Sequence, residues 1–257
     1  MTSHELTCDA LLGGLVRIEQ PRKGQRASAD AVMLAAAVPA GNATGAGLRA
    51  LDLGCGTGVG MLCLAARLPE IAVDGIEIQP DLVALAERNI AANDMERRLR
   101  IVHGDICERG GPLAPGRYDQ VFANPPYFDT PRHRASPHAG RATARSGNGT
   151  AELSHWIAAM LRYARPGGGI TLIQRSDRLP EMLAALTEPE SGSRAGAIRI
   201  IPLWSRAGEP AKRVILRAVK DSKAPLTLEP GLVLHRPDGS YYPEIDAVLR
   251  NGAALPI

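Results

Sequence analysis

The chain has 257 residues, 45% of them hydrophobic and 22% charged, which is ordinary for a globular protein that buries a sizeable core. Its formal net charge of +3 is too small to indicate a nucleic-acid partner without regard to where the arginines lie. The most apolar stretch, residues 31–39, is too short to cross a bilayer, and the spacing of the four cysteines fits neither a zinc site nor a disulfide framework. We therefore expect a cytoplasmic protein without a metal or a membrane segment.

The first predicted element is a helix over residues 28–38, which follows a polar stretch at 20–26. A linker rich in glycine, alanine and asparagine comes next, at residues 39–47. Residues 1–47 are therefore predicted to form a helical extension of one large domain. A domain boundary near Gly47 is the second interpretation.

From Leu48 to Lys220, short apolar runs alternate with longer helical patterns. Near-continuous runs of Val, Ile and Leu that are joined by helices are typical of parallel strands buried on both faces. The pattern therefore predicts a doubly wound, mostly parallel α/β sheet. The predicted strands are 48–54, 72–78, 99–104, 118–123 and 168–174, and the predicted helices are 58–67, 80–93, 151–164 and 177–186.

A glycine-rich turn, Asp52-Leu53-Gly54-Cys55-Gly56-Thr57-Gly58, joins the first of these strands to its helix. The glycines Gly54, Gly56 and Gly58 let the backbone approach a ligand closely and adopt positive φ angles. A dinucleotide dehydrogenase also carries glycines at this turn. Asp52, however, puts a carboxylate just ahead of the first glycine, where it would repel a pyrophosphate, so a dehydrogenase is the least favoured interpretation.

The next two predicted strands each end at an acidic residue. Glu77 ends the second strand, where its carboxylate can accept from both hydroxyls of a ribose, and Gly104-Asp105-Ile106 ends the third, where an acid can accept from an adenine amino group. Because an open α/β sheet binds ligands at the carboxyl ends of its strands, these turns converge on one crevice. They predict a site for an adenosine-containing cofactor.

The fourth strand is followed by Asn124-Pro125-Pro126-Tyr127. An amino group on an aromatic ring is a poor nucleophile, because its lone pair is delocalised into the ring. The Asn124 side-chain oxygen and the Pro125 carbonyl can accept hydrogen bonds from the two N–H groups of such an amino group, which localises its lone pair. The prolines hold these acceptors in place before binding, and Tyr127 offers a flat face on which a base can stack.

Residues 130–149 follow directly and contain six basic or histidine side chains but no acid. Prolines and glycines in this segment predict a loop. A cationic loop beside the acceptor site would contact RNA phosphates. The predicted RNA-binding residues are Arg132, Arg134, Arg141 and Arg145.

Two β-rich runs, 197–204 and 212–219, come at the end of the alternating pattern without a helix between them. They predict an antiparallel hairpin at the edge of the sheet. The last segment, 221–257, mixes prolines with short apolar pieces and one helical stretch at 244–250. The chain is thus predicted to be one domain, 1–257, with an extension at 1–47, a catalytic core at 48–220 and a tail at 221–257.

The D-x-G-x-G-x-G turn resembles the first motif of the class I methyltransferases, a Rossmann-like family. The resemblance implies S-adenosylmethionine as cofactor, a seven-stranded sheet with an antiparallel edge hairpin, and cofactor contacts at Gly54, Gly56, Glu77 and Asp105. To these we add Asp52, Gly58 and Ile106, which share the same turns, and Asn124 after the fourth strand. The N-P-P-[YF] signature resembles that of enzymes that methylate planar nitrogens, namely adenine N6, guanine N2 and protein glutamine N5.

The flanks resemble the bacterial tRNA(Val) adenine-N6 methyltransferase group. The similar segments are Leu12-Gly13-Gly14, the stretch from Gln20 to Ala35, Arg141-Ala142-Thr143-Ala144-Arg145, and the tail from Leu232 to Tyr241. The resemblance implies an adenine in tRNA as substrate and places Asp30 near the amino group of the cofactor. Methylation of another planar nitrogen, and a non-catalytic RNA-binding relative, are the alternatives; oligomeric state is not predicted.

Overall fold

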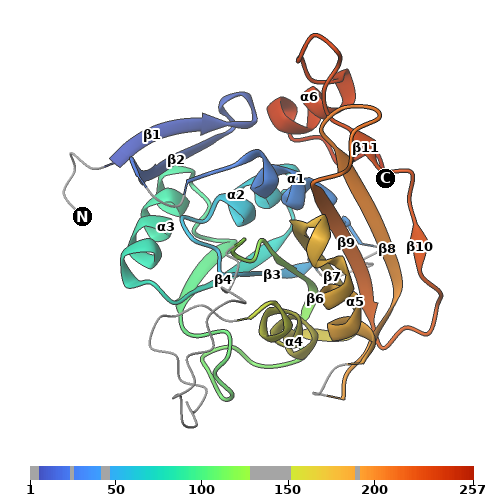
Figure 1. Ribbon diagram of the computed structural model, residues 1–257. Helices are drawn as coiled ribbons and strands as arrows, with labels where there is room; N and C mark the ends of the chain where they lie inside the picture. Colours follow the sequence, from blue (N-terminus) through green and yellow to red (C-terminus); the bar gives the residue numbers. More distant parts are fainter. Residues whose placement is uncertain (1–5, 24–25, 42–46, 128–151, 189–191) are drawn as a thin grey trace, which may run out of the picture.

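The computed structural model describes residues 6–23, 26–41, 47–127, 152–188 and 192–257 (Figure 1). Within them, a nine-stranded sheet has the order β10-β8-β9-β7-β6-β3-β4-β5, and β11 pairs with β8. Its strands are β3 Arg49–Leu53, β4 Ala72–Glu77, β5 Leu99–His103, β6 Tyr118–Ala123, β7 Ala164–Arg175, β8 Ala195–Trp204, β9 Arg213–Lys220, β10 Thr227–Leu228 and β11 Leu232–Val233.

The strands β7, β6, β3, β4 and β5 are parallel neighbours, which confirms the predicted α/β class. Helices cover both faces of the sheet, as Figure 1 shows. The helices α1, α2 and α3 pack on one face, and α4 and α5 pack on the other. Their bounds are α1 Ala29–Ala37, α2 Val59–Arg67, α3 Pro80–Ala92, α4 Leu153–Tyr163 and α5 Leu179–Thr187.

The predicted hairpin is present, because β9 runs antiparallel to both β7 and β8. It is not the edge of the sheet, however, since β10 and β11 each add a short strand parallel to β8. The sheet therefore has nine strands and not the seven that were expected. Both additional strands are two residues long and lie among prolines, so they carry no alternating pattern that could have revealed them.

The N-terminal extension was predicted to be helical, but it also contains two strands. Strands β1 (Leu6–Leu11) and β2 (Val16–Pro21) form an antiparallel pair ahead of α1. Alternate residues of β2 are buried, with Val16 and Ile18 in the core, which is the period of two expected of a half-buried strand.

Asn89 of α3 and Asn93, the C-cap residue of that helix, bind the free edge of β2 as a neighbouring strand would. Asn89 accepts from the backbone N–H of Glu19 at 2.7 Å and donates to the Glu19 carbonyl at 2.9 Å. Asn93 makes the equivalent pair of bonds to Arg17, at 2.9 and 2.6 Å. The hairpin is therefore attached to the helix that follows the β4 strand.

The tail packs back on the extension. Helix α6 (Pro243–Asn251) contacts α1, and the Leu255 backbone N–H donates to the Ala36 carbonyl at 3.1 Å. Arg67 of α2 donates to the carbonyls of Ala35 and Val38 at the end of α1. One hydrophobic cluster thus contains residues from the extension, the core and the tail, while the division at 47 and 220 stays a prediction.

Candidate active site

Four turns with the predicted site residues lie side by side at the carboxyl ends of the parallel strands. The last residue of β3, Leu53, is in register with Ile76 of β4 and Ala123 of β6. Glu77 is in register with His103, the last residue of β5. The glycine turn, the two acidic turns and the Asn-Pro-Pro-Tyr segment therefore leave the sheet at neighbouring positions.

The glycine turn uses the conformational freedom of its glycines. Gly54, Gly56 and Gly58 have φ angles of 64°, 57° and 84°, which side chains rarely tolerate. Gly54 also has no room for a side chain, because an added Cβ would lie 2.3 Å from the ring of Trp156. Trp156, on α4, was not predicted from the sequence, and its buried indole N–H has no partner within the described residues.

Glu77 stabilises the turn from the neighbouring strand. One carboxylate oxygen accepts from the backbone N–H of Gly56 at 3.0 Å, and the other accepts from the N–H of Gln79 at the same distance. The side chain is only 4% exposed. The oxygen that binds the Gln79 backbone also accepts from the Gln79 side-chain amide at 3.4 Å. Of the roughly four acceptor positions of a carboxylate, a free one therefore remains on the oxygen that binds Gly56.

Asp52 adds a second buried carboxyl group beneath the same turn. Burial raises its pKa well above the ordinary value and the charge of Glu77 adds to the rise, while a hydrogen bond from the Met61 backbone opposes it. Within the described part of the chain, neither Asp52 nor Glu77 has an ion-pair partner. A cationic ligand at the turn would favour the charged form of the Asp52 carboxyl group, whereas a pyrophosphate would disfavour it further.

The third turn is closed by Asp105, whose side chain accepts from the backbone N–H of Cys107 at 2.8 Å. The adjacent Ile106 is largely buried, at 7% exposure. Ile78, which directly follows Glu77, is 43% exposed and offers apolar surface at this edge. Ile78 was not predicted from the sequence, because a single apolar residue at a strand end forms no motif.

Asn124 has the environment expected of a ligand-binding group. Its side-chain oxygen is buried and has no hydrogen-bond partner among the described residues. The second predicted acceptor, the Pro125 carbonyl, accepts from the amide of Gln174 at 3.3 Å. A carbonyl has two lone pairs, so this bond orients the group and leaves one acceptor position.

Tyr127 is held by two side chains from distant parts of the chain. Its hydroxyl donates to Asp30 of α1 at 2.8 Å, and the guanidinium of Arg213 lies over its ring, 4.4 Å from the centroid. Arg213 also pairs with Asp30, at 3.1 Å. Burial and the Asp30 carboxylate raise the pKa of Tyr127, so the phenol stays protonated at neutral pH.

The structure thus brings Asp30 to the acceptor motif, and its predicted contact with the cofactor stays a prediction. Arg213 and Gln174 were missed, because a lone arginine at the start of a strand and a glutamine inside one carry no motif. The antiparallel direction of β9 brings Arg213 to this edge, opposite Arg175 at the end of β7. The predicted RNA-binding residues Arg132, Arg134, Arg141 and Arg145 lie outside the described residues.

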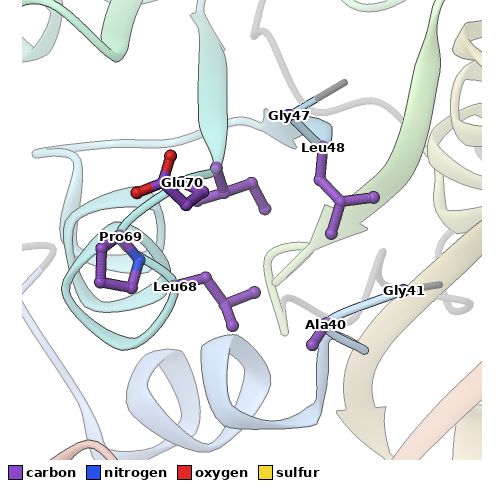
Figure 2. Close-up of a pocket in the computed structure, with 8 residues that line it drawn as sticks. Ala40, Gly41, Gly47, Leu48, Leu68, Pro69 and Glu70 are labelled. Carbon is purple, nitrogen blue, oxygen red and sulfur yellow. The ribbon is translucent and has the colours of Figure 1, made fainter. Parts of the chain in front are cut away.

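A pocket of about 240 Å³ lies away from these turns (Figure 2). It is formed where the chain enters β3 and β4, which is the opposite end of those strands from the glycine turn. Its lining residues are Ala40, Gly41, Gly47, Leu48, Leu68, Pro69, Glu70 and Ile71. We therefore do not assign it to the active site.

The described residues contain neither a metal site nor a membrane-spanning helix. No cluster of three or more His, Cys, Asp or Glu side chains within them is arranged to hold a metal ion. The helices that the structure describes are all too short or too polar to span a membrane.

Comparison with known proteins gives consistent relatives. The model of the methyltransferase small domain family matches residues 31–139. A tRNA1(Val) (adenine(37)-N6)-methyltransferase from Porphyromonas gingivalis is 32% identical over 233 residues, with 88% of each chain covered. The protein of the same name from Tolumonas auensis is 29% identical, covering 90% of this chain and 91% of that one.

The fold is also found among solved structures. A predicted O-methyltransferase from Agrobacterium tumefaciens superimposes with a TM-score of 0.69 and 26% sequence identity. The match covers 88% of this chain and 97% of that chain. Since the match covers more of the chain than the predicted core at 48–220, it includes part of the flanking segments.

Proposed function

This chain belongs to the family of the tRNA1(Val) (adenine(37)-N6)-methyltransferases, and we propose that it methylates the N6 atom of an adenine in tRNA. It is a methyltransferase that uses S-adenosylmethionine. The adenine at position 37, which gives the relatives their name, is the proposed target.

The cofactor is proposed to bind over the glycine turn. The buried carboxyl groups of Asp52 and Glu77 fit a cofactor that carries positive charge on its sulfonium and amino groups. Glu77 would accept from the ribose hydroxyls, and Asp105 from the adenine amino group, with Ile78 and Ile106 against the ring. When bound, S-adenosylmethionine supplies an electrophilic methyl group that needs no further activation.

One observation carries the acceptor chemistry, namely the buried and unpartnered oxygen of Asn124. An amino group that donates to this oxygen and to the Pro125 carbonyl is drawn toward a tetrahedral nitrogen, which frees its lone pair for attack. S-adenosylmethionine would supply the methyl group and leave as S-adenosylhomocysteine, and the methylated nitrogen would pass its extra proton to water. The contribution of Asn124 is therefore to hold a hydrogen-bond acceptor ready in a buried position.

The motif itself accommodates any planar nitrogen, so the choice of tRNA depends on other features. The relatives are named for tRNA, and the arginines of residues 130–149 suit a phosphate backbone. A target base must leave its stack to reach a buried acceptor, which favours a nucleotide in a loop. Guanine N2 in RNA and glutamine N5 in a protein are the competing acceptors.

The test compares two acceptors for the methyl group of labelled S-adenosylmethionine. Purified protein is incubated with unmodified tRNA and, separately, with a peptide-chain release factor, and the label in each is counted. We expect label in tRNA alone, and none with the Asn124→Ala variant as the control. Label in the release factor with none in the tRNA would reject the proposal in favour of glutamine methylation.

A further inference from the structure

The tyrosine of the acceptor motif is fixed in two different ways by residues outside that motif. Its hydroxyl donates to Asp30 at 2.8 Å, which fixes the edge of the ring. The Arg213 guanidinium lies 4.4 Å from the ring centroid, which fixes and covers one face. Asp30 and Arg213 are themselves joined, at 3.1 Å, so the three side chains form a closed set.

These three residues come from parts of the chain that are far apart in sequence. Asp30 lies in the first turn of α1, in the N-terminal extension, and Arg213 is the first residue of β9. Tyr127 follows β6 directly after the prolines. The extension and the antiparallel strand therefore meet at the acceptor site, although neither contributes to the glycine turn.

We propose that Asp30 and Arg213 are positioning residues for methyl transfer, which hold the ring of Tyr127 so that the face opposite Arg213 receives the target adenine. This inference rests on the proposed function, because it concerns the base that the enzyme binds. The prolines fix the backbone before Tyr127 but leave its side-chain torsions free. The two contacts supply the missing constraint, so the ring need not be ordered when the base arrives.

The charge balance of the set argues against a second role for Arg213 as a phosphate ligand. Its guanidinium is already paired with the Asp30 carboxylate and stacked on an aromatic ring. Both charged side chains are also shielded, at 34% and 23% exposure. Its Nε–H donates to Asp30 and one of its Nη groups donates to the Lys212 carbonyl at 3.3 Å, so part of the donor set that would bind a phosphate in a bidentate way is already used by the protein.

The chain offers a matched control for the ion pair. Arg199 pairs with Glu229 at 2.6 Å, and the two side chains are 33% and 21% exposed, nearly as for Arg213 and Asp30. Arg199 lies within β8 and pairs with the strand β10, away from Asn124. Loss of Arg199 therefore reproduces the loss of a partly buried ion pair without touching the acceptor site.

The experiment measures kcat and KM for tRNA, together with the Kd for S-adenosylmethionine, in Arg213→Ala, Arg213→Lys, Asp30→Asn and Arg199→Ala. We expect Arg213→Ala and Asp30→Asn to lower kcat by about ten- to a hundredfold, as for a displaced positioning group. In the Arg213 and Arg199 variants the Kd for S-adenosylmethionine should stay within about threefold of the wild-type value, which also shows that these variants fold. Arg213→Lys should rescue only partly, because an ammonium keeps the charge but not the planar contact.

A double-mutant cycle separates positioning from direct contact with RNA. If Arg213 acts through Tyr127, then Arg213→Ala should have no further effect in a Tyr127→Ala background. An additive loss, or a flatter dependence of tRNA affinity on salt in Arg213→Ala, would overturn the inference and assign Arg213 to the phosphates. Unchanged kcat in Arg213→Ala would overturn it as well. An inactive wild-type enzyme would instead reject the proposed function.

Discussion

At the scale of single residues, Asn124 and Glu77 have opposite hydrogen-bonding states. The Asn124 oxygen is buried without a partner, whereas both carboxylate oxygens of Glu77 already accept from the backbone. A buried acceptor without a partner is unfavourable for stability and is therefore expected at a site that binds a ligand. Asn124 should accordingly act in chemistry, and Glu77 in cofactor binding.

Asn124→Ala should lower the methylation rate by about two to three orders of magnitude, as for the loss of one preorganised hydrogen-bonding group. Since the side-chain oxygen has no partner among the described residues, its removal breaks no bond to that atom and should leave stability nearly unchanged. Single-turnover kinetics and thermal unfolding measure the two effects. An active Asn124→Ala enzyme would mean that the acceptor nitrogen is held by other groups.

Glu77→Ala should weaken S-adenosylmethionine binding by roughly 1–3 kcal/mol, because it removes a charged acceptor from the ribose and a partner from the Gly56 N–H. Calorimetric titration measures the loss. Glu77→Gln is the informative companion, since it keeps one acceptor oxygen but brings N–H donors against the turn. If both variants bind the cofactor as the wild type does, Glu77 does not belong to the site.

At the scale of elements, the sequence pattern predicted what is periodic and missed what is short or isolated. The five core strands and their helices were found within a few residues, because buried parallel strands form continuous apolar runs. The strands β10 and β11 are too short to show a period. The β1–β2 hairpin was missed although Val16 and Ile18 alternate with polar residues, because both strands are only six residues long and only residues 20–26 were interpreted, as a polar stretch ahead of α1.

The candidate site divides in the same way. Glycines, acids and the Asn-Pro-Pro-Tyr segment stand directly after predicted strands, so their convergence follows from the topology of a parallel sheet. Arg213 and Gln174 belong to the site through the register of β7 and β9, which no local pattern encodes. Trp156 likewise reaches Gly54 only through the packing of α4 on the sheet.

One element-scale prediction concerns the link between the β1–β2 hairpin and the cofactor turn. Asn89 is fully buried and, besides binding Glu19, donates to the Thr57 carbonyl at 2.9 Å. Asn89→Asp removes that donor and should weaken cofactor binding by about 1–3 kcal/mol, because the turn loses a buried hydrogen bond. Calorimetry at a temperature where the variant is folded measures the change.

Asn93→Asp is the matched control for this variant. Asn93 bonds the neighbouring position of β2 in the same way, but its amide donates to Arg17 and Asn89 and not to the turn. Its replacement should loosen the hairpin and leave cofactor affinity close to that of the wild type. Equal losses in the two variants would show that docking of the hairpin, and not the bond to Thr57, determines cofactor affinity.

At the scale of the whole molecule, we propose that a cationic cofactor binds at the glycine turn and that a polyanionic substrate binds at residues 130–149. The net charge of +3 hides this arrangement, because acidic groups lie under the glycine turn while the 130–149 segment has only basic charges. Cofactor and RNA binding should therefore respond differently to salt. Screening weakens the contacts with phosphates much more than those with buried carboxylates.

Replacement of Arg132, Arg134, Arg141 and Arg145 by glutamine should flatten the slope of log affinity for tRNA against log salt. Each phosphate contact that is lost should reduce the magnitude of the slope by roughly one unit. Filter binding of tRNA over a salt series measures it, and cofactor affinity should not change. Identical slopes for the variant and the wild type would show that this segment does not contact the phosphate backbone.

The most direct test of the central claim is the identity of the methylated nucleoside. Unmodified tRNA(Val) is incubated with the protein and methyl-labelled S-adenosylmethionine, digested to nucleosides and separated by chromatography with mass detection. A transcript in which adenine 37 is replaced by guanine serves as the control. The account predicts label in N6-methyladenosine from the first transcript and none from the second. Label in N2-methylguanosine, or equal labelling of both transcripts, would contradict it.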